Sequence, residues 1–317
     1  MTEKIIAALI SAMLFTGITG CGREAASVPV KVLRLDRELA SGMTSADAET
    51  RVAAEKLFAV SGYGTLTDSS LSVYNNIPSI AFHREAVEEA FPDMNDVESG
   101  LGEALGVLEK EFPAVVCPKL YAIISPFNQS VITVDSVMFL GLNHYLGIDY
   151  EAYEYFPEYI RKNKRRERIV PDIVEALIRQ YYPYEPRTGY PTALTRMLYE
   201  GSVVEAVIRA TGLDEKDALG MDEHSYEWLE NNEKEMWNAL VTRRLLYSTD
   251  ERVGESLVRP SAVTSILHSE APGMAGRFIG HRIVKSYLKN NNELPPYNIL
   301  LPEFYDGEGT LAASKYH

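Results

Sequence analysis

The chain has 317 residues, of which 46% are hydrophobic and 24% are charged, and its formal net charge at pH 7 is −14. This composition is typical of a folded globular protein. The strong acidity argues against a nucleic-acid-binding protein, which normally carries a basic face, and against broad adhesion to anionic lipid.

The first 21 residues, MTEKIIAALISAMLFTGITGC, combine a charged start, a short apolar run and a small-residue end. The run from Ile5 to Phe15 is shorter than the ~20 residues that span a bilayer, so it predicts a cleavable signal peptide. Ile18-Thr19-Gly20-Cys21 has the pattern of a bacterial lipobox, which predicts a lipid on Cys21. The alternative is an ordinary secretory signal with a chance cysteine. We expect a lipoprotein signal peptide at 1–20, the lipidated cysteine and a tether at 21–27, and one globular domain at 28–317.

The first third of the mature chain is expected to be mainly helical. Residues 28–35 alternate apolar and polar side chains in their second half and predict a first strand. Thr44 or Ser45 is a suitable N-cap for a helix over 44–60. Further helices are predicted at 84–91 and 97–112, the second from a stripe of leucines at helical spacing.

The centre of the chain is rich in β-branched and aromatic residues. Segments 120–125 and 130–134 flank Pro-Phe-Asn-Gln and predict a hairpin, and 136–142 is a third candidate strand. After Tyr150 the patterns are mainly helical. The expected helices lie near 151–164, 171–182, 192–211, 224–247, 251–257 and 274–290.

Local catalytic motifs are missing from the sequence. No histidine opens an H-E-x-x-H pattern, and no G-x-S-x-G or phosphate-binding glycine loop occurs. Cys117 lies in an apolar run and is expected to be a small buried residue. Gly273, Gly276 and Gly280 share one helical face, which favours close helix packing over phosphate binding at a helix start.

One basic run stands out on this acidic chain. RKNKRRER could hold a phosphate, an acidic partner or a lipid head group. The alternative is a solvent-exposed C-terminal end of a helix, where the helix dipole favours cations. The candidate partner-binding residues are Arg161, Lys162, Lys164, Arg165, Arg166 and Arg168.

Six segments of the C-terminal two thirds occur in order: MFLGLNHYLG, RERIVPDIVEAL, MLYEG, EWLENNEKEMW, LLYSTD and APGMAGRFIGHRIVKSYL. Together with the lipobox, this series resembles the GldB-type gliding-motility lipoproteins of Bacteroidetes, and the resemblance is strongest over residues 115–290. It implies a palmitate-bearing envelope protein linked to gliding motility and the associated secretion machinery. It does not imply a reaction.

A more distant resemblance is to zincin metallopeptidases, in which a helix bearing H-E-x-x-H follows a strand and a later helix supplies a Glu. The positions that correspond to the two histidines are Pro171 and Glu175, while Asp172 takes the place of the general base and Glu200 that of the third ligand. Proline cannot bind a metal, and zinc at catalytic centres usually takes an imidazole or thiolate. We therefore expect a peptidase-like scaffold without zinc. Its carboxylates should be splayed apart, partly protonated or paired with residues such as Arg165 or Arg168.

The predicted fold is α+β, predominantly helical with a small central β-sheet, and similar to that of zincins. The predicted function is that of a non-enzymatic, membrane-anchored envelope lipoprotein that acts as a scaffold or binds a partner. One alternative is a metal-dependent, peptidase-like hydrolase that uses Asp172, Glu175 and Glu200. Another is a glycan-binding or glycan-cleaving protein built on the Tyr-rich loops.

We expect no cofactor and no nucleic acid. The expected partners are the membrane, through the lipid on Cys21, and other envelope proteins. Gly22-Arg23-Glu24 follows the cysteine where an Asp would signal inner-membrane retention, so the outer membrane, with the protein facing the periplasm, is favoured.

Overall fold

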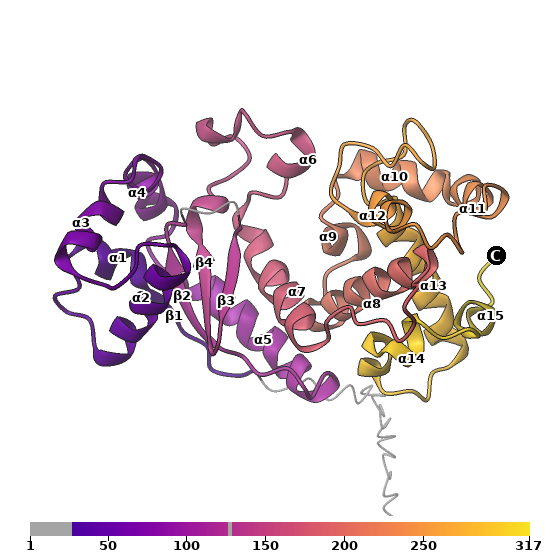
Figure 1. Ribbon diagram of the computed structural model, residues 1–317, viewed down its shortest axis with the longest axis horizontal. Coiled ribbons are helices and arrows are strands. Elements are labelled where there is room, and N and C mark those ends of the chain that lie inside the picture. Colours follow the sequence, from indigo (N-terminus) through magenta and orange to yellow (C-terminus); the bar gives the residue numbers. More distant parts are fainter. Residues whose placement is uncertain (1–26, 126–128) are drawn as a thin grey trace, which may run out of the picture.

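The computed structural model describes residues 27–125 and 129–317 (Figure 1). The predicted signal peptide and Cys21 lie outside the described residues. The N-terminal half contains a four-stranded sheet and the helices that pack beside it. Its elements are β1 (Val32–Arg34), α1 (Leu35–Ala40), α2 (Ala48–Val60), α3 (Asp68–Asn75), α4 (Pro78–Ala90), α5 (Asn95–Glu111), β2 (Lys119–Ile123), β3 (Val131–Val134) and β4 (Val137–Gly141).

The rest of the described chain is helical. Its α-helices are α6 (Glu158–Arg161), α7 (Ile169–Tyr181), α8 (Ala193–Thr211), α9 (Glu215–Leu219), α10 (Glu223–Asn231), α11 (Glu233–Thr242), α12 (Glu251–Val258), α13 (Ala275–Asn290), α14 (Pro302–Tyr305) and α15 (Thr310–Ser314). Short 3₁₀ turns lie at η1 (Leu142–His144), η2 (Glu151–Tyr153), η3 (Arg166–Arg168) and η4 (Pro296–Leu300). The predicted α+β class, mainly helical with a small sheet, is confirmed.

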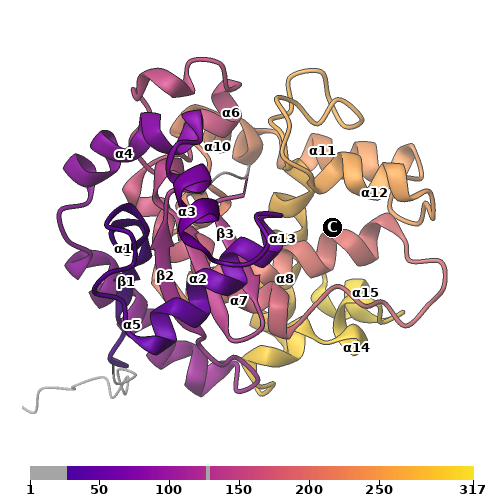
Figure 2. The same cartoon turned by 60° about the vertical axis from the view of Figure 1, so that its left-hand side comes forward.

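The sheet has the strand order β1-β2-β4-β3. β1, β2 and β4 are parallel neighbours, and β3 pairs antiparallel with β4 at the edge. Helices α1 to α4 lie on one side of the sheet, and α7 leads from its other side toward the C-terminal helices (Figures 1 and 2). β2 and β4 are central and almost entirely buried, whereas β3 is half-exposed along its whole length.

The predicted hairpin between 120–125 and 130–134 is wrong, because these two strands are not neighbours. The hairpin is formed by β3 and β4, through a turn at Asp135, whose φ is +52°. The chain can make this tight reversal because Asp tolerates the left-handed conformation better than most residues.

Several predicted helices differ from the observed ones at their ends or in continuity. The N-cap of α2 is Asp47, whose side chain accepts a hydrogen bond from Thr50 N, rather than Thr44 or Ser45. The single helix predicted at 151–164 is replaced by η2 and α6, because Pro157 interrupts it. The segment 224–247 is divided into α10 and α11 at Asn232. The helices predicted at 171–182, 192–211, 251–257 and 274–290 correspond to α7, α8, α12 and α13.

Helix α8 is the centre of the C-terminal half. It contacts α5, α7, α12, α13 and α14, and most of its residues are buried. Its closest neighbour is α13: a Cβ added at Gly280 would lie 2.0 Å from the carbonyl oxygen of Met197, and one at Gly201 would lie 2.2 Å from the carbonyl carbon of Gly280. Gly280 and Gly276 serve close helix packing, as the sequence favoured, the latter against Leu257 of α12. Gly273 does not share their helical face, because it lies in the turn before α13 and approaches the backbone of Ser261. Along the described chain, none of the helices is both long and apolar enough to cross a membrane.

Candidate functional site

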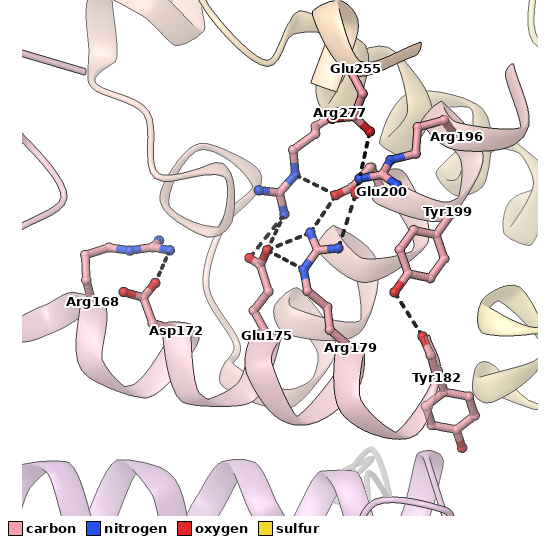
Figure 3. A network of polar contacts seen from close by, with 10 residues as sticks. All are labelled: Arg168, Asp172, Glu175, Arg179, Tyr182, Arg196, Tyr199, Glu200, Glu255 and Arg277. Atoms are coloured by element: carbon pink, nitrogen blue, oxygen red, sulfur yellow. Dashed lines mark hydrogen bonds and ion pairs between the residues drawn. The ribbon is translucent and has the colours of Figure 1, made fainter. Parts of the chain in front are cut away.

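The candidate site lies where α7, α8 and α13 meet beside the edge strand β3. Pro171 lies in the first turn of α7, where a missing N–H costs nothing, and is buried. Asp172 and Glu175 follow on the same helix, and Glu200 comes from α8. The helix crossing at Gly201 and Gly280 brings Arg277 of α13 next to Glu175 and Glu200 (Figure 3).

Glu175 and Glu200 are held together by arginines. Arg179 Nη2 lies 2.8 Å from Glu175 Oε1 and 2.5 Å from Glu200 Oε2. Arg277 Nη2 donates to both carboxylate oxygens of Glu175 at 3.1 Å, and Nε of Arg277 lies 3.5 Å from Glu200 Oε2. Arg196 Nη2 adds a contact of 3.1 Å to Glu200 Oε1. This is the Glu175–Glu200 cluster, whose members are Glu175, Arg179, Arg196, Glu200 and Arg277 (Figure 3).

The cluster keeps both carboxylates ionised. Burial alone raises the pKa of Glu175, but the charges of Arg277 and Arg179 outweigh burial and lower it far below its usual range. The pKa of Glu200 is lowered in the same way by Arg179 and Arg277, against the effect of burial. The Glu200 side chain is only 4% exposed, so its charge depends on these partners.

Asp172 lies one turn away and has different partners. Its carboxylate accepts hydrogen bonds from Arg168 at 2.7 Å and from the hydroxyl of Tyr145 at 3.0 Å. Burial raises the pKa of Asp172, and the nearby Arg168 opposes that shift only in part. Pairing with Arg168 was one of the outcomes that the sequence predicted, whereas Arg165 lies 3.8 Å from Asp217 instead.

A cleft of about 500 Å³ opens between these groups and the sheet edge. Its wall includes Gln129, Ser130 and Val131 beside β3, together with Arg168, Asp172, Glu175, Arg179, Met274 and Arg277. The sequence-predicted carboxylates Asp172 and Glu175 therefore face this cleft, and Glu200 lies next to them in the cluster.

The residues of this site do not fit a peptidase-type zinc ion. Pro171 offers no donor atom, and Glu175 and Glu200 are engaged by guanidinium groups. Among the residues that the structure describes, no group of three or more His, Cys, Asp or Glu side chains is arranged to hold a metal ion. Zinc also favours nitrogen and sulfur ligands over a few carboxylates.

The basic run at 161–168 is divided among internal partners. Lys164 is buried, with Nζ 3.0 Å from His144 Nδ1 and 4.6 Å from the centre of the Phe156 ring, and burial lowers its pKa. Lys162 pairs with Asp222, Arg166 with Asp96, and Arg168 with Asp172. Within the described ranges, Arg161 and Lys164 are the two of the six candidates for which no ion pair is found, and Lys164 contacts His144 and aromatic rings instead.

A second cluster of charged side chains, formed by His281, Glu205 and Glu215, was not predicted from the sequence. His281 of α13 is buried, with Nδ1 2.6 Å from Glu215 Oε1 and Nε2 2.9 Å from Glu205 Oε2. Burial lowers the pKa of His281, but hydrogen bonds and charges from both glutamates outweigh it and raise the pKa above its usual value. The three come from α13, α9 and α8, so only tertiary packing brings them together.

The sequence analysis also did not predict the arginines of the Glu175–Glu200 cluster. Arg179 follows Glu175 by one helical turn, a spacing visible in the sequence. Arg196 stands at the same spacing before Glu200. Arg277 offers no local signal, because α13 is distant in sequence from α7 and α8 and is brought to them by tertiary packing.

The family model of gliding motility protein GldB matches residues 23–317. The chain belongs to the GldB family. This confirms the resemblance found in the sequence and extends it over nearly the whole chain. Membership implies a gliding-motility lipoprotein of the cell envelope. No curated protein and no solved structure shows significant similarity to the chain.

Proposed function

We propose that this GldB-family protein is anchored to the outer membrane by a lipid on Cys21, binds a protein partner and catalyses no reaction. The observation that carries the non-enzymatic part is the engagement of Glu175 and Glu200 by Arg179, Arg196 and Arg277. Carboxylates that serve a metal or a reacting group need free oxygen atoms directed at it. Here the same oxygens accept hydrogen bonds from guanidinium groups.

The energetic cost of recruiting these carboxylates also supports the proposal. A cation entering between Glu175 and Glu200 would have to displace Arg277, whose side chain is 10% exposed, and Arg179, whose side chain is 33% exposed. Breaking a buried ion pair costs about 3–5 kcal/mol because it leaves an uncompensated charge. The cluster therefore favours a structural role in holding α7, α8 and α13 together.

Partner binding is supported by the cleft beside the cluster. Its wall combines cations of the basic run and of α7 and α13 with polar groups of the sheet edge. Arg168, one of the residues proposed from the sequence for partner binding, lies in this wall. An open cleft that combines apolar side chains with fixed charges suits recognition of another chain.

The test is metal analysis of the full chain, purified in detergent without chelators, beside a screen of peptidase and glycosidase substrates. We expect well under one equivalent of zinc, manganese or calcium and no hydrolysis. Glu175→Gln should leave both measurements unchanged. Stoichiometric metal together with hydrolysis that Glu175→Gln abolishes would contradict the proposal and favour the metal-dependent hydrolase.

A further inference from the structure

The free edge of the sheet is the starting point. Val131 pairs with Leu140 in the register of β3 and β4, which places Ser130, just before β3, opposite Gly141. Gly141 N–H donates to the carbonyl oxygen of Ser130 at 2.8 Å. In an antiparallel pair, hydrogen-bonded residues alternate with residues whose backbone groups face away. The N–H and C=O groups of Val131 and Thr133 therefore point away from β4, and no described residue bonds to them.

An open strand edge of this kind is a template for another extended chain. β3 is half-exposed at all its positions, and no described helix or strand pairs with its outer side. An added strand would make backbone hydrogen bonds at Val131 and Thr133. These two positions are two residues apart, about 6.6 Å at about 3.3 Å per residue, so the hydrogen bonds involve a segment of about three residues of the added strand.

The cleft next to this edge is lined by more cations than carboxylates, although Glu200 behind the wall also contacts Arg179 and Arg277. Arg168, Arg179 and Arg277 line it, against Asp172 and Glu175. The Arg277 side chain is only 10% exposed. Its Nη2 donates to Glu175 and its Nε lies near Glu200, but no described residue accepts a hydrogen bond from its Nη1.

The start of helix α13 supplies a positive potential beside Arg277. It begins at Ala275, directly after Met274, which also lines the cleft, so Arg277 stands in the first turn. The positive end of the helix dipole favours an anion at this place. A carboxylate is the anion that an extended peptide carries, either on an Asp or Glu side chain or at its C-terminus.

We infer that an extended segment of a partner protein adds as a strand to β3 and places a carboxylate against Nη1 of Arg277. This inference rests on the proposed function, since it specifies the partner-binding site. The backbone bonds supply affinity for any extended chain. The carboxylate contact selects the segment and fixes its register.

The probe is a pool of synthetic random octapeptides passed over the immobilised full chain, with the retained peptides identified by mass spectrometry. Every unamidated peptide has a C-terminal carboxylate, so Asp and Glu should be enriched among the retained peptides only if a side chain makes the contact. Each is then resynthesised with Asp or Glu replaced by Asn or Gln, and separately with an amidated C-terminus. The change that weakens binding identifies the source of the carboxylate, and if neither change weakens binding the inference is wrong.

The matched variants are Thr133→Pro and Thr133→Val. Proline removes the outward N–H without breaking the ladder to β4, whereas valine keeps the N–H and a similar shape. Losing one backbone hydrogen bond should weaken peptide binding up to about tenfold. Binding to Thr133→Val should stay within about twofold of the original chain, which is the scatter of small surface changes. Thermal unfolding checks that both variants fold.

The outcomes separate the inference from the proposed function. Equal binding to Thr133→Pro and to the original chain would overturn the strand addition. Retention of no peptide would overturn the inference, while the proposed function would stand if a partner bound elsewhere on the chain. Release of shortened peptides would contradict the non-enzymatic function and leave the binding site in place.

Discussion

At the scale of single residues, the candidate site depends on buried charges that neutralise one another. Glu200 is the most buried carboxylate of the Glu175–Glu200 cluster and touches Arg179, Arg196 and Arg277. Removing its charge leaves three guanidinium groups with one remaining buried carboxylate. The stability of the site is therefore more sensitive to Glu200 than to any exposed ion pair.

Glu200→Gln should lower the free energy of unfolding by about 3–5 kcal/mol, the range for breaking one side of a buried ion pair. The measurement is urea unfolding followed by circular dichroism. Glu255→Gln is the matched control, because Glu255 contacts Arg196 at 3.4 Å but is 43% exposed. It should cost at most about 1 kcal/mol. A loss below that value for Glu200→Gln would show that the cluster contributes little to stability.

His281 gives a second prediction at this scale, since its pKa is raised in the folded state by Glu205 and Glu215 against the effect of burial. A group with a raised folded-state pKa stabilises the fold fully below its unfolded pKa of about 6.5 and loses that contribution as pH rises through the folded value. Arg209, Arg282 and Tyr226 also face these carboxylates.

His281→Asn should therefore cost the most stability at about pH 6, below the ordinary histidine pKa. Its cost relative to the original chain should shrink as the pH rises through the raised pKa of His281. Urea unfolding of both proteins at a series of pH values measures this difference. A cost that stays constant across the series would mean that packing, rather than the charge of His281, holds the three helices together.

At the scale of elements, the closest packing is the crossing of α8 and α13. Gly280→Ala would place a Cβ 2.0 Å from the carbonyl oxygen of Met197, so the helices must move apart. We expect a loss of stability of about 1–3 kcal/mol, as for overpacked cores, although Ala favours helix by about 1 kcal/mol over Gly.

Gly254→Ala in α12 is the matched control for this prediction. Its new Cβ would meet Arg196 Cβ at 3.7 Å, an ordinary contact. That variant should be neutral or about 1 kcal/mol more stable, because only the helix propensity changes. If Gly280→Ala were as stable as Gly254→Ala, the close crossing would not be needed to hold Arg277 over Glu200.

The same elements show what the sequence could predict. The periodicity of α7, α8, α12 and α13 located these helices because each buries one face or more against neighbours. The strands were located from their composition, but the partner of β2 was predicted wrongly. Local composition does not record whether a strand is central or at an edge. Pairing of β2 with β1 and β4 depends on contacts distant in sequence.

The site was predictable to a similar extent. The shared helical face of Pro171 and Glu175 follows from their four-residue spacing. The same spacing allows Asp172 to pair with Arg168 and Glu175 with Arg179. The contribution of Arg277 requires the tertiary crossing at Gly201 and Gly280. The pairing of Lys164 with His144 likewise depends on how η1 packs against the basic run, so the burial of that lysine was not visible in the sequence.

At the scale of the whole molecule, the predicted anchor sets where the domain can act. Residues 21–27 reach at most about 20 Å when extended, so a lipid on Cys21 would hold the first described residue, Ser27, near the bilayer surface. A domain held at that distance meets partners that are themselves bound to the membrane or lie next to it. Its strand edge and cleft then act at high local concentration.

Cys21→Ala should move the protein from the membrane fraction to the soluble fraction, or leave its signal peptide uncleaved. Two or more acyl chains anchor a protein stably because each buried CH₂ contributes about 0.8 kcal/mol, and the variant has no attachment site for them. Membrane fractionation with immunoblotting measures both outcomes, and Cys117→Ala is the control, since it removes a thiol that lies within the domain. If Cys21→Ala were processed and fractionated like the original chain, the lipid anchor would be wrong and the ordinary secretory signal would be favoured. The domain would then reach its partners by diffusion.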